Sequence, residues 1–227
     1  MANFNSNHLQ EILRLHMQSL SPTEKNPGEM GGGGRRERKK LQTRGLLMES
    51  AWALFENFGY ERVSMEQIAA VAEISKVTLY KYFPAKESLL CEKLNAEISF
   101  DINAVDSHAD KITVCVTQLV SWACTYRIYL PTYISYRLAS PPTDENGLAH
   151  IFSQMTKCAA HHVGAPSPLP PARLGCYLEM LCLGAMRHWL DNPDFELDQE
   201  LHQLLRLGLG WSAPTPAQAE ALPYMGE

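Results

Sequence analysis

Apolar residues recur at intervals of three and four from Arg35 to Leu209, which is the spacing of one buried face of an α-helix. The sequence shows no sustained alternation of apolar and polar residues, the pattern of a half-buried strand. The pattern therefore predicts an all-α fold. The longer expected helices cover 39–57, 86–103, 111–129, 131–139, 147–163, 172–190 and 196–209.

Two shorter helices are expected after the first of these. Ser64 and Gln67 form a capping box, in which each residue satisfies a free backbone amide of the other at a helix start. Ser75 can cap a second short helix, which Pro84 ends. The segment 72–74 between them has the length of a tight turn, so Ser64 to Phe83 reads as a helix-turn-helix.

Composition suggests four parts: a disordered leader and Gly-rich linker (1–34), a helix-turn-helix unit (35–97), a larger helical domain (98–211) and a flexible Pro-rich tail (212–227). Two other interpretations of the leader stay open. Translation could start at Met30, or the stretch from Leu9 to Leu20 could form an interaction helix.

The distribution of charge favours a nucleic-acid partner for the helix-turn-helix unit. The whole chain has a formal net charge of -5, but basic residues outnumber acidic ones between Arg35 and Lys93. The basic run 35–40 could follow a DNA backbone or be a solvated tail.

Other classes of site find little support in the sequence. No apolar run is long enough to span a membrane, and the start of the chain has no export signal, so we expect a cytoplasmic protein. The six cysteines form no CxxC pair and lie among apolar residues, as reduced core thiols do. We expect no catalytic residues, no metal and no cofactor.

The second short helix carries the candidate DNA contacts. Leu79 and Phe83 lie four residues apart and should point into the core, which turns the remaining side chains outward. Lys76 and Val77 suit base edges, whereas the hydroxyls of the outward residues suit phosphates. The candidate DNA-binding residues are Ser75, Lys76, Val77, Thr78, Tyr80, Lys81, Tyr82 and Lys86. The two tyrosines could instead be surface aromatics that support the fold, and Lys86 could be a solvated lysine.

Residues 41–97 resemble the TetR family of transcriptional regulators in apolar spacing, caps, the Thr-Leu-Tyr-x-Tyr-Phe run at 78–83 and the Lys-Glu-x-Leu-Leu step at 86–90. The resemblance implies a homodimer on double-stranded operator DNA, with Tyr80 and Tyr82 at phosphate-contacting positions. Glu73 and Val77 depart from the family's commoner glycines or small residues.

The C-terminal half offers a candidate ligand site and a candidate pairing surface. An aromatic column near 122–136 and a Met- and Phe-bearing helix could line a pocket or pack as ordinary core. The candidate ligand-binding residues are Trp122, Tyr126, Tyr129, Tyr133, Phe152 and Met155. The helices expected at 172–190 and 196–209 carry more apolar surface than they can bury alone, which suggests a four-helix bundle with a second copy.

These features predict a ligand-responsive repressor that binds a near-palindromic operator as a homodimer and is released by a small apolar or aromatic effector. One rival hypothesis keeps DNA binding but makes it constitutive or effector-activated, with the C-terminal domain serving only dimerisation. Two others are an enzyme, for which no motif is evident, and a helical interaction protein that has lost DNA binding.

Overall fold

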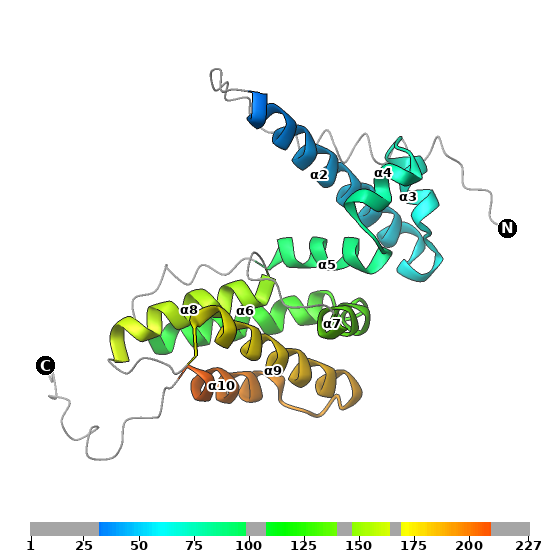
Figure 1. Ribbon diagram of the computed structural model, residues 1–227. Helices are drawn as coiled ribbons and strands as arrows, with labels where there is room; N and C mark the ends of the chain where they lie inside the picture. The colour runs from blue at the N-terminus through cyan, green and yellow to red at the C-terminus, as the bar shows by residue number, and fades with distance from the viewer. Residues whose placement is uncertain (1–31, 99–107, 140–146, 164–168, 210–227) are drawn as a thin grey trace, which may run out of the picture. The chain divides into compact units, whose positions relative to one another are not determined.

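The computed structural model describes residues 32–98, 108–139, 147–163 and 169–209, and every regular element in these ranges is helical (Figure 1). The predicted all-α fold is therefore confirmed, with a helix-turn-helix unit followed by a larger helical unit. The chain divides into Met1–Lys93 and Leu94–Glu227. The expected tail and most of the expected leader lie outside the described residues.

The N-terminal unit begins with helix α2 (Gly32–Phe58). The 3-10 turn η1 (Tyr60–Arg62) and the short helices α3 (Met65–Val71) and α4 (Lys76–Tyr82) follow, and α5 (Lys86–Glu97) closes the unit. Gly59 ends α2 as expected, because its φ of 81° lies in the left-handed region that favours glycine.

Helix α2 starts well before the predicted position at Lys39. The glycines at 32–34 and the basic run 35–40, which we expected to form a linker and an arm, are helical, so that prediction was wrong. Arginine, lysine and glutamate are good helix formers, and extending an existing helix costs much less than starting one. The basic run therefore extends the helix back through the glycines.

The core of this unit lies where the periodicity places it. The predicted stripe of α2 is buried at Leu47, Ala51, Leu54 and Phe55. The inward residues of the following helices are also buried, namely Ile68, Leu79, Phe83, Leu89 and Leu90. The apolar spacing of the sequence therefore identified which face of each helix turns inward.

The second unit contains α6 (His108–Thr125), α7 (Leu130–Ala139), α8 (Gly147–Val163), α9 (Pro171–Asp191) and α10 (Leu197–Gly208). Helix α9 packs against α8 on one side and α10 on another, and α10 also packs on α6 (Figure 1). Helices α8 and α9 approach closely at Gly175, where a Cβ would lie 2.5 Å from the carbonyl oxygen of Ala149.

Two hydrogen-bonded pairs of polar side chains lie inside the second unit. On α7, Arg137 donates two hydrogen bonds of 2.8 Å to the carboxylate of Glu179 on α9, and both side chains are buried. Burial raises the pKa of Glu179, and the positive charge of Arg137 opposes that rise. Near the end of α5, the hydroxyl of Tyr133 donates to Asn95 at 2.7 Å. These four side chains thereby keep hydrogen-bond partners after losing water.

Candidate nucleic-acid interface

Side-chain caps define the two short helices of the helix-turn-helix. At the start of α3, the Ser64 hydroxyl accepts from the backbone N–H of Gln67, and the Gln67 side chain accepts from the backbone N–H of Ser64. At the start of α4, the Ser75 hydroxyl accepts from the backbone N–H of Thr78 at 3.1 Å. Both predicted caps are confirmed, and they fix where the recognition helix begins.

The turn between α3 and α4 contains backbone strain. Glu73 has a φ of 53°, the left-handed region in which a side chain costs about 1 kcal/mol relative to glycine. The turn is therefore formed despite the departure from the family pattern that the sequence shows at this position. Its geometry brings Ser75 into place to cap α4.

Helix α4 presents most of the candidate DNA contacts on its outer face. Leu79 is fully buried, whereas Val77 is 67% exposed and Tyr80 is 46% exposed. Ser75, Lys76 and Lys81 are also exposed, and Thr78 and Tyr82 are half-buried. The structure thus brings these seven candidate residues together on one short element and its cap.

Three of the candidate residues already have side-chain partners within the protein. Lys76 forms an exposed ion pair of 3.1 Å with Glu66 of α3. The pKa of Glu66 is lowered, first by a hydrogen bond from its own backbone and then by Lys76. The hydroxyls of Ser75 and Thr78 lie 2.9 Å apart. These contacts are exposed, and they can exchange for contacts with DNA at little cost.

The ammonium group of Lys86 points into the protein. It donates to the carbonyl oxygens of Tyr60 at 2.8 Å and Val63 at 3.0 Å, and it lies 4.1 Å from the centre of the Tyr60 ring. These contacts tie the start of α5 to the two ends of η1. The structure therefore places this side chain apart from the α4 face and gives it a supporting role that sequence reasoning did not anticipate.

Ion pairs join α2 to α5, and one of them also contacts the residue that ends α4. Arg44 donates bidentate hydrogen bonds to the carboxylate of Glu92. Its guanidinium lies 4.6 Å from the centre of the ring of Phe83, the C-terminal cap of α4. Lys93 pairs with Glu49 at 3.1 Å. The partners are more than forty residues apart in the chain, so no local sequence signal indicates them.

The basic residues of the first turns of α2 are exposed. The side chains of Arg36, Arg38, Lys39 and Lys40 all face solvent. Because these residues are helical, they form a positively charged helix end instead of an extended arm. Such a charge attracts a polyanion regardless of its base sequence.

The six candidate ligand-binding residues lie in the second unit, and most of them are core. The Trp122 ring lies 5.3 Å from that of Tyr133 and 6.0 Å from that of Tyr126. The indole N–H of Trp122 donates to the carbonyl oxygen of Leu94 at 3.3 Å. Trp122, Tyr133, Phe152 and Met155 are buried, whereas Tyr126 and Tyr129 are half-buried. The structure therefore brings the rings of Trp122, Tyr126 and Tyr133 together.

A family comparison identifies the N-terminal unit. Residues 47–92 match the family described as bacterial regulatory proteins, tetR family. This segment, with its two capped short helices, is thus similar to the helix-turn-helix domain of TetR-family regulators. The matched segment includes α3, α4 and the turn with Glu73.

Curated relatives match less than half of the chain. The transcriptional repressor KstR of Mycobacterium tuberculosis is 34% identical over 86 residues, which are 38% of this chain and 35% of KstR. The regulator YuxN of Bacillus subtilis is 46% identical over 50 residues, which are 22% of this chain and 17% of YuxN. The chain therefore spans about a third or less of the length of these relatives, which are named as transcriptional regulators.

Solved structures share the fold over a longer stretch. The Thermus thermophilus repressor FadR, solved with lauroyl-CoA, has a TM-score of 0.60 and 22% identity, covering 76% of this chain and 98% of FadR. The R. erythropolis transcriptional repressor QsdR has a TM-score of 0.53 and 16% identity, covering 75% of this chain and 95% of QsdR. These likenesses show that the larger helical unit has the TetR-type fold.

Two other kinds of site find no support in residues 32–98, 108–139, 147–163 and 169–209. Within those ranges, no helix is long and apolar enough to cross a membrane. Within the same ranges, no group of three or more histidine, cysteine, aspartate or glutamate side chains could hold a metal ion.

Proposed function

We propose that this protein is a ligand-responsive transcriptional repressor that binds a near-palindromic operator as a homodimer. The observation that carries the proposal is the outer face of α4, where Lys76, Val77, Tyr80 and Lys81 are exposed on a capped helix of a TetR-family domain. A short helix presented by supporting helices fits the major groove, which is about 12 Å wide.

In this proposal, Ser75, Lys76 and Val77 read base edges near the start of the recognition helix. Thr78, Tyr80, Lys81 and Tyr82 anchor it to phosphates. The exposed basic end of α2 adds attraction to the DNA that does not depend on sequence. Lys86 contributes by holding the unit together, because its ammonium group is bound to Tyr60 and Val63.

The exposed apolar stripe of α9 supports pairing with a second copy. Tyr177, Met180 and Leu181 are exposed at helical spacing. Gly184 continues the same stripe and has open space beside it, because a Cβ added there would meet no atom within 4 Å. On α10, Leu207 is 79% exposed. A twofold axis through these helices would build a four-helix bundle and bury all of this surface. Two recognition helices could then read grooves about 34–36 Å apart.

The second unit is the proposed sensor of a small effector that is largely apolar or aromatic. Trp122, Tyr126, Tyr129, Tyr133, Phe152 and Met155 offer the apolar and aromatic surface for it. The T. thermophilus FadR structure with lauroyl-CoA supports the idea that a fold of this type can hold an apolar ligand. An effector releases DNA if it binds the DNA-incompetent state more tightly.

DNA binding is tested by selecting operator fragments from random duplexes with the full chain and measuring affinity by fluorescence anisotropy. Tyr80→Ala and Lys81→Ala should each weaken binding about five- to tenfold, as loss of one phosphate contact does. Lys157→Ala removes an equally exposed lysine from α8 and serves as the control. Unchanged affinity in both α4 variants, with the fold intact by circular dichroism, would contradict the DNA-contact proposal.

Dimerisation is tested separately by sedimentation. Leu181→Glu puts a charge in the apolar stripe of α9 and should convert the dimer to a monomer, whereas Leu138→Glu on α7 should not. A wild-type chain that sediments as a monomer would rule out the pairing. A dimer whose operator affinity no apolar or aromatic compound changes would favour a constitutive regulator.

A further inference from the structure

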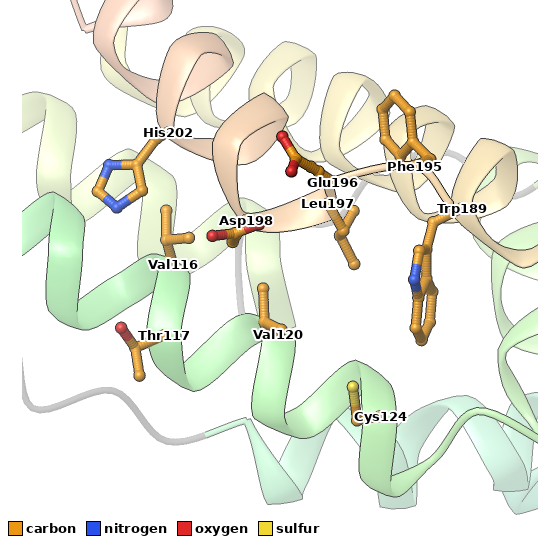
Figure 2. A pocket seen from close by; sticks show the side chains of 10 residues that line it. All are labelled: Val116, Thr117, Val120, Cys124, Trp189, Phe195, Glu196, Leu197, Asp198 and His202. Carbon is orange, nitrogen blue, oxygen red and sulfur yellow. The ribbon is translucent and has the colours of Figure 1, made fainter. Parts of the chain in front are cut away.

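A cavity of about 450 Å³ opens between α6, the end of α9 and the start of α10, all within the second unit (Figure 2). Its lining contains none of the six residues that sequence reasoning assigned to a ligand pocket. Helix α6 contributes one wall, and Trp189 and His202 lie at opposite ends. The lining residues are Val116, Thr117, Val120, Cys124, Trp189, Phe195, Glu196, Leu197, Asp198 and His202.

Aromatic rings form the end of the cavity near Trp189. Phe195 lies beside Trp189, and Val120 provides an apolar surface across from them (Figure 2). The Trp189 ring already accepts a cation, because the guanidinium of Arg127 lies 4.6 Å from its centre. The electron-rich faces of such rings attract positive charge and pack well against flat or apolar groups.

Two carboxylates, Glu196 and Asp198, line the same space. Among the residues that the structure describes, neither side chain has a hydrogen-bond or ion-pair partner. A helix start carries about half a positive charge, which by itself favours anions. The first turn of α10 carries Asp198 and Glu200, so the full negative charges outweigh that effect. The cavity therefore favours a cation over an anion.

Two walls of the cavity face away from exposed apolar residues of the proposed dimer surface. Leu207 and Asp198 are nine residues apart on α10, which turns them to opposite sides of the helix at about 100° per residue. On α9, Met180 and Trp189 are also nine residues apart and likewise face opposite ways. A second copy that contacts Met180 and Leu207 would therefore lie on the opposite sides of these helices from Trp189 and Asp198.

We propose that this cavity binds an organic monocation with an aromatic or apolar body, such as an aryl-substituted ammonium. The charged group lies between Glu196 and Asp198, and the body packs on Trp189, Phe195 and Val120. Binding at this site does not depend on the proposed DNA-binding function and is measured without DNA.

The first test is calorimetric titration of the full chain with benzyltrimethylammonium. Benzyl alcohol provides a neutral aromatic control, and phenylacetate provides an anionic one. The cation should bind about tenfold more tightly than either, because charge pairs with two exposed carboxylates favour it by that order. Equal binding of benzyl alcohol would overturn the assignment of a cation.

Matched variants locate the site. The double variant Glu196→Gln/Asp198→Asn keeps the side-chain shapes and should weaken binding about tenfold. Glu200→Gln is the control, because Glu200 lies in the same turn of α10 but lines a neighbouring hollow instead. Undiminished affinity in the double variant, or a loss confined to Glu200→Gln, would overturn the proposal.

Cys124 offers an independent, local readout because it lies in the cavity wall and is exposed. Saturating benzyltrimethylammonium should slow its alkylation by iodoacetamide severalfold, as followed by peptide mass spectrometry. Cys176 lies outside the cavity lining and should keep its rate. Cys115 should not react in either case, because burial raises its pKa to about 12. Alkylation of Cys124 at the same rate with and without the cation would also overturn the proposal.

Discussion

Replacing Lys86 with methionine separates a role in the fold from a role on DNA. Methionine keeps most of the side-chain length but removes the ammonium group that donates to Tyr60 and Val63. A hydrogen bond to a charged group contributes about 1.5–3 kcal/mol, and an exposed cation–π contact contributes about 0.5–1 kcal/mol. Because the site is only partly buried and one ammonium serves all three contacts, Lys86→Met should lower the free energy of unfolding by about 2 kcal/mol.

The assay is urea unfolding of the full chain, followed by far-ultraviolet circular dichroism. With an m-value of about 2 kcal/mol/M, the midpoint of the transition that reports the N-terminal unit should fall by roughly 1 M. Lys81→Met is the control, because it removes an equal charge from an exposed position of the same unit. That control should leave the midpoint unchanged and weaken DNA binding.

The opposite pattern would refute this reasoning. Lys86→Met could leave the urea midpoint within about 0.2 M of the wild-type value. If it also lowers the slope of log affinity against log salt concentration by about one, the amount expected for one phosphate contact, then the ammonium group contacts DNA. In that case the contacts with Tyr60 and Val63 would be exchanged when the operator binds.

Three further substitutions test other parts of the structure. Glu66→Gln breaks the ion pair with Lys76 and removes a negative charge beside α4. Operator affinity measured by anisotropy should therefore rise severalfold at low salt. An unchanged affinity would mean that Lys76 makes no DNA contact. Glu73→Gly relieves the left-handed strain and should raise the unfolding free energy by about 1 kcal/mol in urea, whereas a loss of stability would contradict the strain argument. Gly175→Ala pushes a Cβ against the backbone of α8 and should cost at least about 2 kcal/mol, whereas Gly184→Ala should be tolerated; equal thermal stability of the two variants would refute the close approach.

Local signals in the sequence explain what could be predicted of the fold and the site. The caps at Ser64 and Ser75 depend on residues three positions away, and the buried face of α4 follows from the spacing of Leu79 and Phe83. Both relations lie within one turn of a helix, so the sequence displays them directly.

Relations between distant segments explain what could not be predicted. Arg44 contacts Glu92 only because α2 and α5 pack together. Lys86 donates to two backbone carbonyl oxygens, which every residue has, so the sequence does not indicate these partners. The cavity joins Cys124, Trp189 and Asp198 from three separate helices. The aromatic column was visible as a pattern, but whether Trp122 and Tyr133 line a pocket or fill a core depends on the helices packed over them.

The internal contacts of Lys86 bear on how such a sequence would change during evolution. A descendant that no longer regulated any gene would lose the need for exposed residues such as Tyr80 and Lys81, and random substitution would soon replace them. Replacing Lys86 would instead lower the stability of the domain by about 2 kcal/mol through its bonds to Tyr60 and Val63, so this lysine is retained wherever the folded domain is still needed. Among homologues, a lysine at this position therefore indicates an intact domain, and only the outer face of α4 indicates one that is still used on DNA.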